Sequence, residues 1–152
     1  AFQAKTARLQ RALLGAVALT RETGKRLELV REALDGTPAA GEELAASARD
    51  LTLRLAAIET ALTGDREMRR RNENDAPSIR ERVQGVVDGH WFATQAPTRT
   101  HLDAYEIASK AFAGQLAALR QLVEVDLAAL ERQMEEAHAP YTPGRVPVWQ
   151  PE

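Results

Sequence analysis

The end of the last predicted helix carries the one Glu-x-x-His spacing in the chain, Glu135 with His138. Helical bundles that hold two iron or manganese ions use two such pairs and two further glutamates, all facing inward. Here the single pair lies directly before Pro140, at a helix end. We therefore expect a solvated terminus where His138 complements the helix dipole, with no metal and no cofactor bound.

Two further histidines, His90 and His101, flank a predicted connection and have Asp88 and Asp103 two residues away. Neighbouring histidines and carboxylates can act as acid-base pairs. No motif marks a nucleophile, however, and no glycine-rich loop could cradle a phosphate. We expect both imidazoles to bond a carbonyl or water, and we predict no catalytic residue and no enzyme activity.

Arginines cluster over residues 66–71 and continue at Arg80 and Arg82, a pattern that can attract phosphates or acidic headgroups. Acidic residues alternate with them, and the whole chain has a formal net charge of -2. At physiological salt, mixed charges cancel within about 8 Å. The segment is therefore expected to be a solvated loop with local ion pairs, and nucleic acid is not expected as a partner.

A polar pair, Thr20 and Thr23, falls on the predicted apolar face of the first helix. Such a pair can mark a ligand cavity inside a bundle. A helical threonine normally bonds the carbonyl one turn back, so we expect satisfied core residues instead.

Large aromatic residues lie near the third helix end, at Trp91 and Phe92, and in a proline-rich tail, at Tyr141 and Trp149. They could clamp the tail onto the helices or anchor a partner. We predict the clamp, with Tyr141 and Trp149 over apolar side chains, and keep the free tail as the alternative.

Apolar residues recur at alternating steps of three and four, the spacing of one helix face. The pattern predicts helices over about 3–34, 40–63, 78–92 and 98–138. Thr37 and Pro38 suit the start of the second helix, and Ser78 with Glu81 has the spacing of a capping box. The stripe of the last helix is expected to pass through Leu119, Val123 and Leu127.

These helices must bury their apolar faces against one another. We predict an all-α fold in which residues 1–138 form an antiparallel up-down-up-down four-helix bundle. The proline-rich tail, 139–152, is predicted to be extended and packed on it. Charged residues interrupt every leucine-rich run, so no membrane insertion is expected. The 152 residues contain no cysteine, so stability must come from packing.

The last third of the chain resembles the C-terminal end of large bacterial proteins with sortilin-like, BNR-type β-propeller repeats, often labelled glycosyl hydrolases. The segments that carry the resemblance are Pro97-Thr98, Tyr105 to Ala108, Leu116 to Leu127 and Ala139 to Arg145. The resemblance implies a C-terminal helical appendage of an exported protein, in the periplasm or outside the cell. It transfers no catalytic residue, since nothing here matches a propeller repeat.

We therefore expect a non-catalytic structural or protein-interaction domain. Its partner would be a β-propeller domain of the parent chain or another protein, and the sequence does not indicate an oligomeric state. The alternative is a metal- or small-ligand-binding bundle of ferritin-like architecture.

Overall fold

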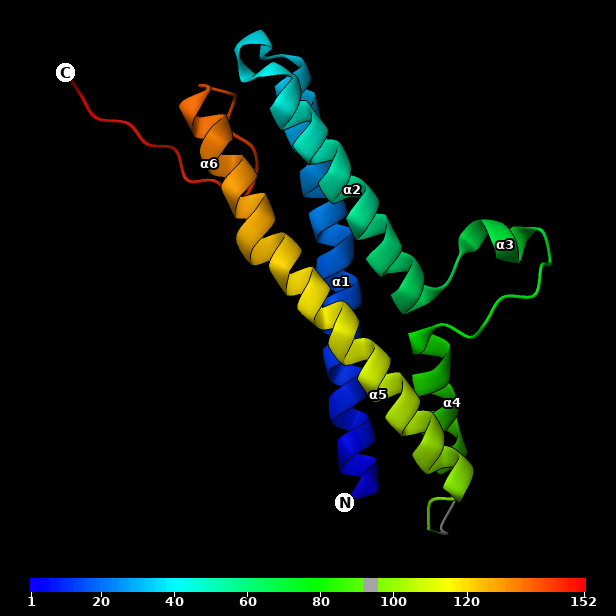
Figure 1. Cartoon of the computed structure of the whole chain (residues 1–152). Coiled ribbons are helices and arrows are strands. Elements are labelled where there is room, and N and C mark those ends of the chain that lie inside the picture. Colours follow the sequence, from blue (N-terminus) through cyan, green and yellow to red (C-terminus); the bar gives the residue numbers. More distant parts are fainter. Residues whose placement is uncertain (92–95) are drawn as a thin grey trace. The chain divides into compact units, whose positions relative to one another are not determined.

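The computed structural model describes residues 1–91 and 96–152, with only the backbone described for Trp91. All regular structure in these ranges is helical, which confirms the predicted all-α class (Figure 1). The elements are α1 (Phe2–Asp35), η1 (Pro38–Ala40), α2 (Gly41–Thr63), α3 (Arg66–Arg70), α4 (Ile79–Trp91), α5 (Arg99–Arg120), η2 (Gln121–Leu127) and α6 (Ala128–Glu136).

The chain divides into two compact units, which are described separately. The first unit comprises Ala1–Thr20 and Ala57–Leu119, and the second comprises Arg21–Ala56 and Arg120–Glu152. The long helix α1 contributes its first part to one unit and its second part to the other.

The first unit is built on the start of α1, with α4 and α5 against it. Phe2 of α1 contacts His90 of α4 and Tyr105 of α5, with ring centroids 4.8 and 5.5 Å apart. Its core residues, by element, are Leu13, Ala16 and Val17; Ile58 and Leu62; Ile79, Val83 and Val86; and Ala108, Phe112 and Leu119. Each buried leucine or phenylalanine contributes about 1.5 to 3 kcal/mol of transfer free energy.

Helix α4 begins with the predicted capping box. The Ser78 amide donates to a Glu81 carboxylate oxygen at 2.7 Å, and the Glu81 amide donates to the Ser78 hydroxyl at 3.2 Å. The bond that the Ser78 amide donates stabilises the ionised Glu81 carboxylate and lowers its pKa. The preceding connection, residues 65–77, contains α3, whose first amides are capped by the Asp65 carboxylate.

The second unit brings together the end of α1, the first part of α2, and the η2–α6 segment. Gly24 of α1 faces Leu55 of α2, Arg26 of α1 pairs with Glu131 of α6, and Arg54 of α2 pairs with Asp126 of η2. Its core residues, by element, are Leu27, Val30 and Leu34; Leu44, Ala48, Leu51 and Leu55; and Leu122, Leu127, Leu130 and Met134.

The turn between α1 and α2 differs from the expected capping in one detail. The Thr37 hydroxyl bonds the Ala33 carbonyl one turn back, at 2.7 Å, so its side chain does not cap the next helix. Pro38 opens η1 as expected, because its missing N–H is harmless in a first turn.

Residues 121–127 form a π-helical segment where continuous α-helix was predicted. The buried positions there are Leu122 and Leu127, five residues apart, while the predicted core residue Val123 is only half-buried. In a π-helix each backbone hydrogen bond joins residues five positions apart, so residues with this spacing lie on the same face. Both leucines therefore stay on the inner face. The expected step of four between Val123 and Leu127 was therefore wrong.

Candidate functional site

The histidines singled out from the sequence meet inside the first unit. His90, near the end of α4, is 7% exposed, and its ring lies 5.3 Å from that of His101 on α5. Gly89 makes this approach possible, because a Cβ at that position would lie 2.5 Å from His101 Nε2. Sequence spacing alone did not indicate that the two imidazoles are neighbours.

His90 Nε2 and His101 Nδ1 do not bond a carbonyl among the described residues, whereas the alternative bond to water stays a prediction. Among the described protein groups, His90 Nε2 and His101 Nδ1 are buried without a hydrogen-bond partner. Their neighbouring carboxylates bond elsewhere, since Asp88 accepts from Gln84 and Asp103 accepts from Arg99. The acid-base pairs considered from the sequence are therefore not formed. One nitrogen of each imidazole is left without a hydrogen bond to a described protein group.

A hollow of about 390 Å³ opens beside His90. Its lining comes from α1 and α4: Gln3, Thr6, Ala7, Gln10, Val87 and His90. Neutral imidazole nitrogens can accept a proton or bind a transition metal. Within residues 1–91 and 96–152, no three His, Asp or Glu side chains gather as a metal-binding group.

The Glu-x-x-His pair at the end of α6 has a different role from a metal motif. His138 lies beyond the last helical residue in a left-handed conformation with φ 54°. Its amide bonds the Glu135 carbonyl, and the Ala139 amide bonds the Met134 carbonyl. These two bonds form a Schellman termination, so His138 ends the helix and does not sit within its last turn as expected.

The first part of the tail, residues 139–145, lies over a partly buried ion pair. Arg26 of α1 forms a bidentate pair with Glu131 of α6, with N···O distances of 2.8 and 2.6 Å. Gly144 covers the guanidinium closely, because a Cβ at its position would come within 2.8 Å of the Arg26 side chain. Gly144 also has φ 97°, which only glycine adopts without strain.

Arg145 holds this part of the tail together. Its guanidinium donates to the Pro140 carbonyl at 2.5 Å, to the Thr142 hydroxyl at 3.3 Å and to the Glu135 carboxylate at 3.3 Å. The side chain is 7% exposed and lies 5.2 Å from the Tyr141 ring. Thr142 is also buried, so residues 139–145 form an ordered turn on α6 and α1.

The rest of the tail, residues 146–152, is exposed and extended (Figure 1). Val146, Val148 and Trp149 are 87%, 75% and 80% exposed. The expected position of Trp149 over apolar side chains was therefore wrong. Tyr141 is 43% exposed, and its hydroxyl bonds Glu135 and accepts from the Val148 amide, both at 3.0 Å. This polar bond accounts for its orientation better than the apolar clamp did.

The other two aromatic candidates are not placed by the structure. Phe92 lies outside the described residues, and only the backbone of Trp91 is described, at the end of α4. Their expected roles as tail clamp or partner anchor stay predictions.

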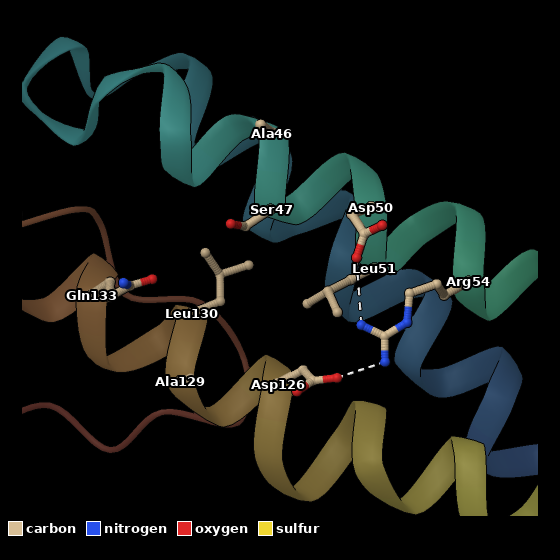
Figure 2. A pocket seen from close by; sticks show the side chains of 9 residues that line it. All are labelled: Ala46, Ser47, Asp50, Leu51, Arg54, Asp126, Ala129, Leu130 and Gln133. Carbon is tan, nitrogen blue, oxygen red and sulfur yellow. Dashed lines mark hydrogen bonds and ion pairs between the residues drawn. The ribbon is translucent and has the colours of Figure 1, made fainter.

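A second hollow lies in the second unit, between α2 and the η2–α6 segment, with a volume of about 450 Å³. Nine side chains line it: Ala46, Ser47, Asp50, Leu51, Arg54, Asp126, Ala129, Leu130 and Gln133. Figure 2 shows the two leucines in its middle, Gln133 near one end and the charged residues at the other. Both leucines are almost completely buried, so the walls of the hollow are mainly small and polar side chains.

An ion-pair group closes one end of this hollow (Figure 2). Arg54 donates to Asp126 at 2.6 Å and to Asp50 at 3.4 Å. The bond from Arg54 lowers the pKa of Asp126, and the bond to Asp126 raises the pKa of Arg54. Asp126 lies within the π-helical segment, a type of helix irregularity that is often found at functional sites.

Two other candidates have ordinary structural roles. Thr20 and Thr23 are buried, and the Thr20 hydroxyl bonds the Ala16 carbonyl at 2.8 Å, as predicted. The arginine-rich segment forms ion pairs, as expected, including Arg66 with Glu59 and Arg69 with Glu81. The expected loop was wrong for residues 66–70, which form the short helix α3 because the Asp65 carboxylate caps its first amides.

Sequence reasoning missed the two ion pairs of the second unit. Glu131 follows Leu130 and stands four residues after Leu127, so it falls on the edge of the apolar stripe. A charge at that position signals a buried partner, because an isolated buried carboxylate is very costly. Arg54 and Asp126 had no comparable signal, since both look like surface residues of amphipathic helices.

Comparison with known proteins gives no relative for this chain. No family model, no curated protein and no solved structure matches it. In the described ranges, no helix has both the length and the apolar character needed to cross a membrane.

Proposed function

We propose that this chain is a non-catalytic protein-interaction domain whose binding element is the tail segment 146–152. The exposure of Val146, Val148 and Trp149 carries the proposal. A tryptophan that stays in water loses the stabilisation of burial, and tryptophan is enriched among residues that dominate binding energies.

The ordered turn before this segment supports the same role. Residues 139–145 are fixed to α6 by Arg145 and by the termination at His138. The binding element therefore leaves from a rigid base, and its prolines further restrict its backbone. A segment that is already stiff loses less entropy when it binds a partner.

The resemblance of the last third supplies a context for this proposal. Residues 139–145 include the Thr-Pro-Gly-Arg motif that is the most specific part of that resemblance. We infer a C-terminal appendage of an exported β-propeller protein, in the periplasm or outside the cell, with a propeller domain as one partner. The reading frame encoding the full-length protein is expected to contain propeller repeats before this domain.

Binding to that adjoining propeller domain, produced as a separate protein, tests the proposal. Calorimetry should detect a complex that Trp149→Ala weakens roughly 30-fold or more, the usual effect of removing an aromatic hot spot. Leu53→Ala, which removes an exposed side chain of α2, is the matched control and should change little. A complex that tolerates Trp149→Ala would contradict the role of the tail.

A second candidate function is a metal- or ligand-binding bundle, which the unbonded nitrogens of His90 and His101 favour. Two imidazoles on one tetrahedral zinc ion have centroids about 5 Å apart, given Zn–N bonds of about 2.0 to 2.1 Å. The observed 5.3 Å is compatible with that arrangement. Titration with Zn²⁺ should then give one site, lost in His90→Ala and in His101→Ala but kept in His138→Ala.

One finer structural prediction also remains a proposal, the up-down-up-down four-helix arrangement of residues 1–138. Hydrogen exchange of the isolated chain would separately test the exposed state of residues 146–152, because a docked tail protects its amides and a free one does not.

A further inference from the structure

Two features of the second unit match each other in size. One is the exposed segment that ends in Trp149, and the other is the 450 Å³ hollow between α2 and the η2–α6 segment. Hollows of this size hold groups as large as an aromatic side chain. The edges of the buried Leu51 and Leu130 form the base of the hollow, and the Gln133 carbonyl on its rim can accept the indole N–H.

The tail cannot place Trp149 in the hollow of its own chain, because the two lie on opposite sides of α6. At about 100° per residue, Glu131 and Glu135 lie on one side of α6, and Ala129 and Gln133 lie on the other. Arg145 is bonded to Glu135, whereas Ala129 and Gln133 line the hollow.

A second bond holds the tail on the Glu135 side right up to the tryptophan. The Tyr141 hydroxyl lies 3.0 Å from both the Glu135 carboxylate and the Val148 amide. Trp149 directly follows the residue with the anchored amide, while α6 is about 10 to 12 Å wide. Figure 1 shows the tail leaving α6 on the side away from α2.

We propose that Trp149 of one copy of this chain inserts into the α2/α6 hollow of a second copy, and that the exchange is reciprocal. This inference rests on the proposed function of the tail and names its partner. Reciprocal exchange gives a closed two-fold dimer, because each copy presents one tail and one hollow.

The contact area fits a weak dimer. One tryptophan brings about 150 to 250 Å² of surface, and the two flanking valines extend the contact. Two such arms stay below the roughly 1,200 to 2,000 Å² of standard specific interfaces, so we expect a dimer that dissociates readily on dilution.

Sedimentation velocity of the full chain, from about 5 to 500 µM, tests the proposal over the range in which weak dimers dissociate. Wild type should show a concentration-dependent dimer. Trp149→Ala should weaken it roughly 30-fold or more, and so should Ser47→Trp, which fills the hollow from an exposed position of α2. The matched control is Ala56→Trp, two and a half turns along the same helix and on its opposite face, and it should dimerise like wild type.

Mixing the two defective variants gives the sharpest test. Trp149→Ala keeps an intact hollow, and Ser47→Trp keeps an intact tail, so together they can form one arm. A larger species in the mixture than in either variant alone is expected. Ala129→Glu, on the opposite wall of the hollow, serves as a second blocking variant, with circular dichroism confirming that each variant is folded.

Three results would overturn the inference. The first is a wild-type chain that is monomeric throughout this range. The second is a dimer that Trp149→Ala does not weaken. The third is a dimer that depends on Trp149 but tolerates folded Ser47→Trp and Ala129→Glu, which would place the tail elsewhere on the second copy. The calorimetric test with the propeller domain separates the two proposals. If that complex depends on Trp149 while any of these three results is found, the proposed function stands and the second copy is the wrong partner.

Discussion

The two halves of the tail each contain two prolines, yet one is docked and the other is not. Residues 139–145 contribute polar groups, Thr142 and Arg145, that find partners on α6 and within the turn. Residues 146–152 contribute valines, a tryptophan and few polar groups, and they stay exposed. Proline determines that both halves avoid helix, but hydrogen bonds and an ion pair determine which half is held.

Removing the ion pair beneath the docked half should have the largest effect. Glu131→Ala leaves Arg26 partly buried without its carboxylate, and we expect a loss of about 2 to 4 kcal/mol of unfolding free energy. Urea unfolding measures it. Glu136→Ala, an exposed glutamate of the same helix, should cost less than about 0.5 kcal/mol. Equal effects of the two changes would show that the ion pair does not stabilise the docked half.

A methyl group at Gly144 should push residues 139–145 away from the Arg26–Glu131 ion pair. Gly144→Ala forces a side chain into the left-handed region and against the Arg26 guanidinium, so we expect a loss of about 1 to 3 kcal/mol. The control is Gly114→Ala, in an open position within α5, which should stabilise the helix by about 0.5 to 1 kcal/mol. Thermal unfolding of both variants checks the opposite signs. Similar melting temperatures would mean that the turn at 144 relaxes freely.

Acid should weaken the ion pair of η2 in which Asp126 closes one end of the hollow. Its pKa is lowered by the Arg54 bond, so the unfolded state binds more protons across the acidic range. The contribution is complete above the ordinary aspartate pKa, about 3.9, and is lost as pH falls through the lower folded value. Asp126→Asn should cost less than about 1 kcal/mol at pH 6, because Arg54 is partly exposed. Its difference from wild type should shrink as the pH falls below the ordinary aspartate pKa, and a constant difference would contradict this.

Trp149→Ala should have the smallest effect on the folding of one chain. The side chain is exposed, so unfolding free energy at low protein concentration should change by less than about 0.5 kcal/mol. Acrylamide quenching in a Trp91→Phe background reports the exposure directly. Poor quenching at low concentration, together with a loss of stability in Trp149→Ala, would show that Trp149 packs on its own chain. Both halves of the tail would then be docked.

Periodicity predicted most of the helical core because burial follows helix faces directly. The stripes in α1 and α2, such as Leu27 with Val30 and Leu51 with Leu55, are buried as expected. Local capping was also predictable, since Ser78 and Glu81 depend only on their own spacing. The π-helical segment was not predictable, because two patterns fit the sequence equally well. Val123 and Leu127 have the spacing of an α-helical stripe, and Leu122 and Leu127 have the five-residue spacing of a π-helix.

The candidate site was less predictable, since it depends on residues that are distant in sequence. No residue near Arg26 in the sequence indicates that it pairs with Glu131, 105 positions later. Nor does the sequence indicate that Gly144 covers this pair. The exposure of Trp149 was mispredicted because the apolar side chain suggested burial, whereas polar Thr142 and Arg145 are the residues that hold the tail. The approach of His90 to His101 required the missing side chain of Gly89 to be seen in three dimensions.

The bond from the Val148 amide to the Tyr141 hydroxyl has a consequence for aggregation. An exposed stretch with valine and tryptophan is the type of segment that stacks into intermolecular β-sheets, which need free N–H groups at regular intervals. Pro147 and Pro151 have none, and the Val148 N–H is already occupied within its own chain. The segment can therefore present apolar side chains to a partner while offering few donors for growth of a fibril.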